Sequence, residues 1–288
     1  MRNRTGRKIG FIFIAAMTVL AGRTPAAEQT QGTEKEQGKV EYIEWNDTWQ
    51  YAGFSKIHSD KTVLFHAEDA VCNGHTVCVN AGHGTSGGEQ VHTLCHPDGT
   101  PKVTSGSTAA GAVEATAIAA GTTLLDGTTE AKANLQMALI LKDLLLAEGY
   151  NVLMPRTTED AQLDNIARTV LANELAECHL SIHYDSTERD KGFFYMSVPD
   201  VASYRAMEPV ASHWEGHEKL GQSILEGVKK AGIPLFENGS MPVDLTQTSY
   251  STVPSVDLEV GDRASKWSED VQTGIAKGIV EGVNIFFG

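Results

Sequence analysis

Two histidines and two glutamates are spaced along the chain where they could build a hydrolytic metal site. His83 lies in a Gly-His-Gly turn that follows a β-rich run, and His183 ends a second β-like run. Glu130 opens a helical pattern, and Glu259 stands near the end of a third apolar run. Two histidines and a carboxylate can hold Zn²⁺ with one position open, while a separate carboxylate serves as general base. We therefore expect His83, Glu130 and His183 to bind one zinc ion and Glu259 to be catalytic.

Alternating strand and helix patterns predict the scaffold that positions these residues. The strand patterns cover 76–81, 150–154, 179–183, 192–198 and 255–260, and the helix patterns cover 130–148, 163–176, 215–231 and 268–285. This alternation predicts a three-layer α/β fold, in which a mostly parallel twisted sheet carries helices on both faces. Such sheets bind ligands at the carboxyl ends of their strands, where His83, His183 and Glu259 all lie.

Each of the four candidates also has a purely structural explanation. His83 could shape its loop, Glu130 could be a first-turn acid favoured by the helix dipole, and His183 could be an ordinary strand-end histidine. Asp257 shares a strand face with Glu259, so these two carboxyl groups could simply satisfy each other.

Four other histidines offer weaker metal sites. His213 and His217 have an i, i+4 helical spacing that can bind zinc, but the acid between them is misplaced for a His-Glu-x-x-His motif. His92 and His96 lie within residues 84–128, a region rich in Gly, Thr, Ser and Ala that we expect to form a long loop or lid near the site.

The N-terminus has the pattern of an export signal. Basic residues precede an apolar run at 9–22 and small residues near Ala26, which predicts a cleaved signal peptide over residues 1–26. A retained anchor is less favoured, because spanning a bilayer takes roughly 20 apolar residues. We expect a disordered tether at 27–40, an ordered extension at 41–72 packed on a catalytic domain at 73–288, and a secreted or cell-envelope location without a stable membrane anchor.

Charge and cysteine content narrow the possible partners. Five of the 23 basic residues and none of the 37 acidic ones lie in residues 1–26, so cleavage would take the net charge from −14 to about −19. This acidity argues against nucleic acid as a partner. The four cysteines, Cys72, Cys78, Cys95 and Cys178, predict up to two disulfides in an exported chain, with free buried thiols as the alternative.

The ordered set of motifs resembles the zinc-dependent N-acetylmuramoyl-L-alanine amidases of the Amidase_3 catalytic family. The likeness runs from about Thr76 to Gly288. It comprises Val79-Asn-Ala-Gly-His-Gly84 for the first ligand, Thr129-Glu-Ala-Lys-Ala-Asn-Leu135 for the second, Gly149–Arg156, Arg168 with Ala172-Asn173, Ser181-Ile-His183 for the third ligand, and Val253–Gly261 around the catalytic glutamate.

The resemblance implies a cell-wall hydrolase that cuts the amide between N-acetylmuramic acid and L-alanine of peptidoglycan, using one Zn²⁺ and Glu259 as base and acid. The chain departs from the family pattern at Asn80-Ala81, where Asp-Pro is usual, at Asp185, where Asn is usual, and at Asp262-Arg263 after the glutamate. The alternatives are an amidase fold that binds wall fragments without cutting them and a zinc peptidase acting on stem peptides. We expect a monomer.

Overall fold

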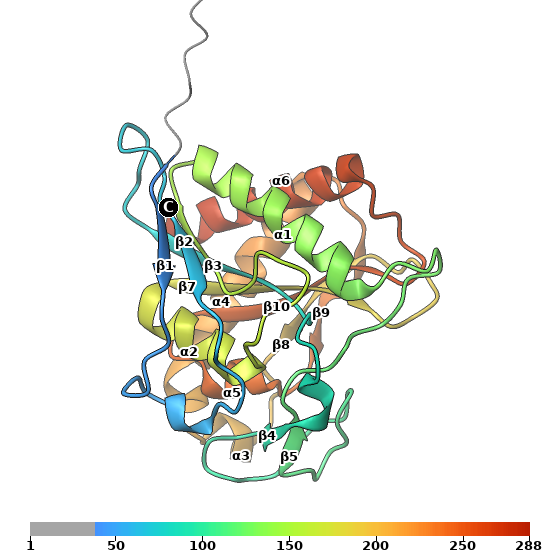
Figure 1. The fold of residues 1–288 in the computed structure, drawn as a ribbon. Helices are drawn as coiled ribbons and strands as arrows, with labels where there is room; N and C mark the ends of the chain where they lie inside the picture. The colour runs from blue at the N-terminus through green and yellow to red at the C-terminus, as the bar shows by residue number, and fades with distance from the viewer. Residues whose placement is uncertain (1–37) are drawn as a thin grey trace, which may run out of the picture. The chain divides into compact units, whose positions relative to one another are not determined.

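A single eight-stranded sheet organises the computed structural model, which describes residues 38–288 (Figure 1). Its strand order is β1-β2-β6-β3-β7-β10-β8-β9. The strands are β1 Val40–Ile43, β2 Thr62–Phe65, β3 Thr76–Ala81, β6 Asn151–Met154, β7 Cys178–Asp185, β8 Phe193–Ser197, β9 Leu235–Pro242 and β10 Ser255–Asp262. The helices are α1 Glu130–Ala147, α2 Asn165–Leu175, α3 Ala202–Arg205, α4 Val210–Lys230, α5 Thr246–Tyr250 and α6 Glu269–Phe287.

The sheet is mostly parallel, as predicted. The central strands β6, β3, β7 and β10 pair in parallel, as do β8 and β9, whereas β1–β2, β2–β6 and β10–β8 are antiparallel. The centre of the sheet is covered on both faces, which explains why β3 and β10 read as continuous buried runs.

Helices cover both faces of the sheet (Figure 1). The larger core joins α1, α4 and α6 to alternate residues of β3, β7 and β10, such as Val79, Ile182 and Leu258. The opposite alternation, such as Cys78, packs against α2. Alternate residues of these strands therefore face either the larger hydrophobic core or α2, and His183 and Glu259 lie on the α2 side.

The segment before β3 extends the sheet at one edge. β1 pairs with β2 and β2 with β6, so residues 40–65 add two antiparallel strands that the sequence patterns did not predict. Between these strands, Trp45, Trp49, Tyr51 and Phe54 pack on the buried Tyr250 and on α2 residues. These contacts explain why an aromatic-rich stretch stands outside the alternating pattern.

The 84–128 region is mostly irregular but is held by buried polar contacts. It contains the 3-10 helix Gly88–Gln90 and a hairpin of β4 His92–Leu94 with β5 Glu114–Thr116, which lies next to α3 (Figure 1). The buried Asp244, between β9 and α5, accepts hydrogen bonds from Val103 N at 2.6 Å and Thr104 N at 3.2 Å and pairs with His96 and Lys102. These contacts hold this part of the 84–128 region against residues 241–247.

The expected disulfides are absent among the four cysteines, all of which lie in the described residues and are free. Cys78 and Cys178 lie on neighbouring strands, but Cys178 belongs to the core beneath α1 while Cys78 belongs to the core beneath α2. Their thiols therefore point to opposite faces of the sheet and cannot be joined. The disulfide prediction is wrong for this structure.

The remaining expectations are met to different degrees. The five predicted strands and four predicted helices all form, with ends shifted by a few residues; α4 begins at Val210 rather than at 215. The expected signal peptide and all but the end of the expected tether lie outside the described residues. Between residues 38 and 288, the helices are too short or too polar to cross a membrane.

Candidate metal centre

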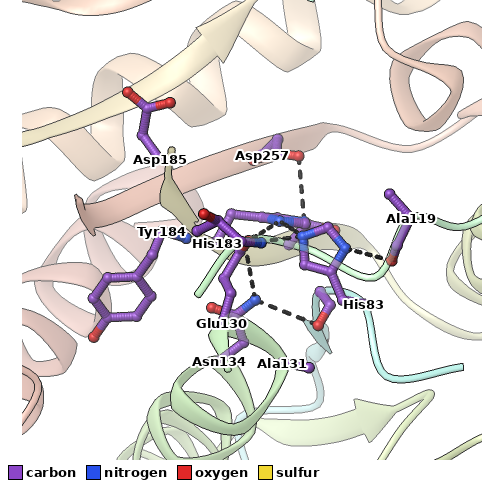
Figure 2. Close-up of polar contacts among 12 residues, drawn as sticks. His83, Ala119, Glu130, Ala131, Asn134, His183, Tyr184, Asp185 and Asp257 are labelled. Atoms are coloured by element: carbon purple, nitrogen blue, oxygen red, sulfur yellow. Dashed lines mark hydrogen bonds and ion pairs between the residues drawn. The ribbon is translucent and has the colours of Figure 1, made fainter. Parts of the chain in front are cut away.

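Three side chains from different elements meet at one point above the sheet (Figure 2). His83 Nε2 lies 2.9 Å from Glu130 Oε1, and His183 Nδ1 lies 3.1 Å from each of these two atoms. The three atoms thus form a nearly equilateral triangle. Zn–N and Zn–O bonds of about 2.0–2.1 Å at tetrahedral angles would put such donors about 3.3 Å apart. The triangle is therefore the right size for one small divalent cation.

The fold explains the convergence. β3 and β7 are adjacent and parallel, so the turn after β3 and the end of β7 meet at the same edge of the sheet. Gly82 N continues the pairing by donating to Ile182 O at 3.0 Å. α1 begins at this edge with Glu130, whose backbone N–H donates to Thr122 O.

Hydrogen bonds to the other ring nitrogen fix the tautomer of His83. Its Nδ1 lies 2.8 Å from Ala119 O, which can only accept, so Nδ1 carries the proton (Figure 2). Neutral His83 then presents a lone pair at Nε2, facing the lone pairs of ionised Glu130. Only a cation or an additional proton can satisfy acceptors placed this close together. The donor set and its geometry fit a metal ion.

Glu130 is held in its ionised form. Burial alone would raise its pKa, but the contacts with the rings of His183 and His83 outweigh burial and hold that pKa well below its usual range. Thr122 N donates to Oε2 at 2.7 Å, and Asn134 Nδ2 lies 3.3 Å from Oε1. A β-carbon at Gly121 would lie 2.7 Å from His83 Cδ2 and 2.8 Å from Glu130 Oε2, so only glycine lets the chain wrap this closely.

Glu259 lies beside the cluster on β10. Glu259 stands opposite His183 of β7 in the strand register, and both line one cavity. The residue is only 7% exposed, and its Oε2 has no hydrogen-bond partner. Burial, followed by the charges of Asp257 and Glu130, raises the pKa of Glu259 well above its ordinary value. A buried, unpaired carboxyl group with a raised pKa is typical of a proton-transfer residue.

The site face of the sheet carries polar side chains in rows. Asn80, Ser181 and Asp257 are cross-strand neighbours one row below His183 and Glu259. Asn80 Nδ2 donates to Ser181 Oγ at 2.7 Å. Asp257 and Glu259 do not satisfy each other: Asp257 Oδ1 is buried without a partner, and Asp257 Oδ2 lies 3.5 Å from His183 Nε2 (Figure 2).

Two buried arginines, which the motif analysis did not assign a role, hold the turn that carries His83. Arg168 donates to Ala81 O at 2.8 Å, His83 O at 2.8 Å and Asn80 Oδ1 at 3.1 Å. Arg156 donates to Gly82 O at 2.9 Å. Burial lowers the pKa of Arg168 to about 9 and that of Arg156 to about 10, so both remain cationic at neutral pH. With Asn80 in place of an acid, the charge of Arg168 is met chiefly by carbonyl oxygens.

The departures at Asp185 and Asp262 are paired locally. Asp185 contacts Lys191 Nζ, and Asp262 accepts from Lys191 N at 2.8 Å. The Lys191 ammonium also lies 4.6 Å from the Phe194 ring and 4.5 Å from the Phe236 ring. The extra acid of Asp185 is thus neutralised by a lysine from the same loop, with no change to the three clustered donors.

A cavity of about 760 Å³ opens over the cluster. Its lining combines the polar row, His183 and Glu259 with residues of the 84–128 region and of Met241–Gln247. This volume is in the range of substrate pockets. Residues of the 84–128 region thus line the cavity that holds the cluster.

The other candidate histidines have structural roles. His217 is buried and its Nδ1 accepts from Ser255 N at 2.9 Å; burial lowers its pKa to about 3, so it is neutral. His96 binds Asp244, and His92 is exposed on β4. Among residues 38–288, the only group of three or more His, Cys, Asp or Glu side chains placed to hold a metal is His83, Glu130 and His183.

Comparisons with known proteins bear on the family and the fold. A family model described as N-acetylmuramoyl-L-alanine amidase (Amidase_3) matches residues 77–284. The solved N-acetylmuramyl-L-alanine amidase of Mycobacterium smegmatis is 19% identical, with a TM-score of 0.61 over 76% of this chain and 98% of that chain. The N-acetylmuramoyl-L-alanine amidase of Clostridium difficile 630 is 20% identical, with a TM-score of 0.53 over 75% of this chain and 97% of that chain. No curated protein sequence matches.

Proposed function

The chain belongs to the N-acetylmuramoyl-L-alanine amidase family, and from that premise we propose that it is a zinc-dependent hydrolase of peptidoglycan. Its reaction would cleave the amide between the lactyl group of N-acetylmuramic acid and L-alanine of the stem peptide. The observation that carries the proposal is the triangle of His83 Nε2, Glu130 Oε1 and His183 Nδ1, with edges of 2.9, 3.1 and 3.1 Å, inside a polar cavity.

We propose that these three side chains hold one Zn²⁺. Two imidazoles and one carboxylate are a ligand set of hydrolytic zinc sites and leave a position open. The bound ion would supply a Lewis acid for the scissile carbonyl and lower the pKa of a water molecule. Ala119 O and Thr122 N support the choice, because they orient His83 and Glu130 from behind.

Glu259 is proposed as the general base and acid. Its carboxylate takes a proton from the attacking water and returns it to the leaving nitrogen, so that L-alanine departs as a neutral amine. Two facts support this role: its Oε2 has no protein partner, and burial together with the neighbouring acids raises its pKa well above the ordinary value of a carboxyl group.

The cellular setting follows from the substrate. Peptidoglycan lies outside the cytoplasmic membrane, so we propose that residues 1–26 are an export signal, that 27–40 is a tether, and that 73–288, with the packed extension 41–72, is the catalytic unit. The 84–128 region would act as a wall or lid of the substrate cleft. The protein would act as a monomer on the wall.

The test is digestion of purified peptidoglycan with the zinc-loaded protein, followed by mass spectrometry of the soluble products. The proposal predicts intact stem peptides with a free L-alanine amine, formed by the wild type but not by the chelated protein or by Glu259→Gln. Shortened stem peptides would indicate a peptidase instead. Absence of products from a zinc-loaded, folded protein would indicate a binding module.

A further inference from the structure

Asp257 is a buried carboxylate that the proposed reaction does not use. Its side chain lies on β10 two residues before Glu259, on the same face, and the residue is 8% exposed. Neither oxygen makes a hydrogen bond: Oδ1 is fully covered without a partner, and Oδ2 lies 3.5 Å from His183 Nε2. Burial raises the pKa of this carboxyl group, so a partner that donates a hydrogen bond or carries positive charge is needed to keep it ionised.

The surroundings leave His183 as that partner. In the described part of the chain, the charged groups that act on Asp257 are His183, Glu130 and His83. Glu130 is an acid and repels it, and Glu259 is a second acid two residues along the strand. His83 directs its Nδ1 proton to Ala119 O and its Nε2 into the metal triangle, so neither nitrogen faces Asp257. Among these groups, His183 alone presents a possible donor to Asp257, with Nε2 3.5 Å from Oδ2.

The two nitrogens of His183 face opposite environments. Nδ1 points into the triangle, 3.1 Å from His83 Nε2 and 3.1 Å from Glu130 Oε1, while Nε2 is directed at Asp257 (Figure 2). Nδ1 can bind a metal only if the ring proton is on Nε2. A carboxylate below Nε2 stabilises that tautomer and raises the basicity of Nδ1.

The strand next to Asp257 is ordered by a chain of hydrogen bonds. Arg168 donates to Asn80 Oδ1, Asn80 Nδ2 donates to Ser181 Oγ, and Ser181 is the cross-strand neighbour of Asp257. The carboxylate therefore stands on a rigid strand beside a hydrogen-bonded chain. A movement of a few tenths of an ångström shortens the 3.5 Å contact into hydrogen-bond range.

We propose that Asp257 is a positioning residue for the metal ligand His183: it accepts the Nε2 proton, fixes the tautomer and directs the Nδ1 lone pair at the zinc position. The inference rests on the proposed metal function of the cluster. His83 is oriented in the same way. Ala119 O, in the 84–128 region, accepts the Nδ1 proton of His83, as Asp257 of β10 accepts the Nε2 proton of His183.

The experiment measures zinc affinity by competition with a chelator for the wild type, Asp257→Asn and Asp257→Leu. Asp257→Leu removes the acceptor and is expected to weaken zinc binding about 10–100-fold. Asp257→Asn keeps an uncharged acceptor oxygen, so its loss of zinc affinity should be smaller. Melting of the chelated protein separates this role from a structural one. Removing an unpaired buried carboxylate leaves the metal-free melting temperature unchanged or higher, while the rise caused by zinc shrinks.

Asp164→Asn is the matched control. Asp164 is equally buried, but it caps α2 and accepts from Ala167 N at 2.7 Å, on an element that holds none of the three ligands. Its substitution should lower the melting temperature without changing zinc affinity. If Asp257→Leu does not fold, the isosteric Asp257→Asn carries the comparison.

Long-range ¹H–¹⁵N NMR of the zinc-loaded wild type reads the tautomer directly. The expected spectrum has His183 metallated at Nδ1 and protonated at Nε2. Zinc affinities within twofold of wild type in both variants, or metallation of His183 at Nε2, would overturn the inference. Neither readout uses peptidoglycan, so an inactive wild type with the expected affinities and spectrum would contradict the proposed function alone.

Discussion

Substitution of Gly82 by alanine should disable the metal site through a single steric contact. A β-carbon built on Gly82 lies 2.2 Å from Cε1, 2.4 Å from Nε2 and 2.7 Å from Nδ1 of His183, so the imidazole lies directly against this glycine. The backbone of Gly82 has no positive φ, and alanine is therefore tolerated by the main chain itself. The whole effect falls on His183.

The size of the effect follows from these distances. Carbon atoms in contact are normally about 3.5–4.0 Å apart, so the ring must move by roughly 1.3 Å. A metal site tolerates errors of about 0.2 Å in its ligand distances. A misplacement of about 1 Å typically costs on the order of 100-fold in rate, equivalent to about 2.7 kcal/mol. We expect Gly82→Ala to lower kcat/KM by at least this factor and zinc affinity by more than about tenfold.

The assay compares peptidoglycan hydrolysis and chelator-competition zinc affinity in Gly82→Ala, with Gly274→Ala as control. Gly274 lies in α6 with no heavy atom within 4 Å of its would-be β-carbon. The control should keep full activity and gain about 0.5–1 kcal/mol of stability from the better helix former. A folded Gly82→Ala protein with activity and zinc affinity within twofold of wild type would refute the packing argument.

Three further outcomes are expected. Arg168→Met should lower the free energy of unfolding by about 3–5 kcal/mol in denaturant titrations and abolish zinc binding. The reason is that buried carbonyl oxygens, including His83 O, lose their donor. A decrease in the free energy of unfolding of less than about 1 kcal/mol would contradict this. Asp164→Ala should lower the free energy of unfolding by about 3 kcal/mol, because the backbone N–H groups of Ala167, Lys56 and Ile57 lose the carboxylate that accepts from them. The folded protein should keep its activity. Unchanged stability, or a folded but inactive variant, would contradict this prediction. In chelated protein, Glu259→Gln should be more stable than wild type at pH 8. The pKa of Glu259 is raised in the folded state, so its stabilising proton is fully present below the unfolded value of about 4.5 and is lost as pH rises through the folded pKa. Thermal melts should show the gap closing toward pH 4, and a pH-independent gap would speak against a raised pKa.

The sequence predicted the cluster because the rule behind it is topological. His83, His183 and Glu259 end strand patterns, and parallel strands direct their carboxyl ends to one edge, so the residues meet without knowledge of any contact. The central strands β3, β7 and β10 were predictable for the same reason, since burial on both faces leaves continuous apolar runs. Glu130 was predictable as the first residue of a strongly periodic helix.

Other parts left no readable signal. The sequence Glu237-Asn238-Gly239 within β9 is typical of a turn, yet β9 pairs in parallel with β8 at the edge of the sheet. β1 and β2 are short strands at one side of the sheet, and their pairing depends on a long connection. The hairpin β4–β5 lies in a region rich in Gly, Thr, Ser and Ala, where no strand pattern is visible.

The supports behind the ligands could not be read from residue types either. Ala119 O and Thr122 N are backbone atoms, and only the path of the chain places them against His83 and Glu130. Asp257 was visible as a neighbour of Glu259, but its position below His183 Nε2 depends on the register of β10 with β7. The disulfide prediction failed for a related reason, because the number of cysteines says nothing about which sheet face each thiol occupies.

Hydrolysis of a defined muropeptide in ¹⁸O-labelled water tests the central claim most directly. With zinc-loaded protein, the account predicts two products. The N-acetylmuramic acid fragment carries one ¹⁸O in its lactyl carboxylate, and the unlabelled stem peptide begins with a free L-alanine amine. Label in a carboxylate of the stem peptide, or an intact muropeptide after incubation with folded, zinc-bound protein, would contradict it.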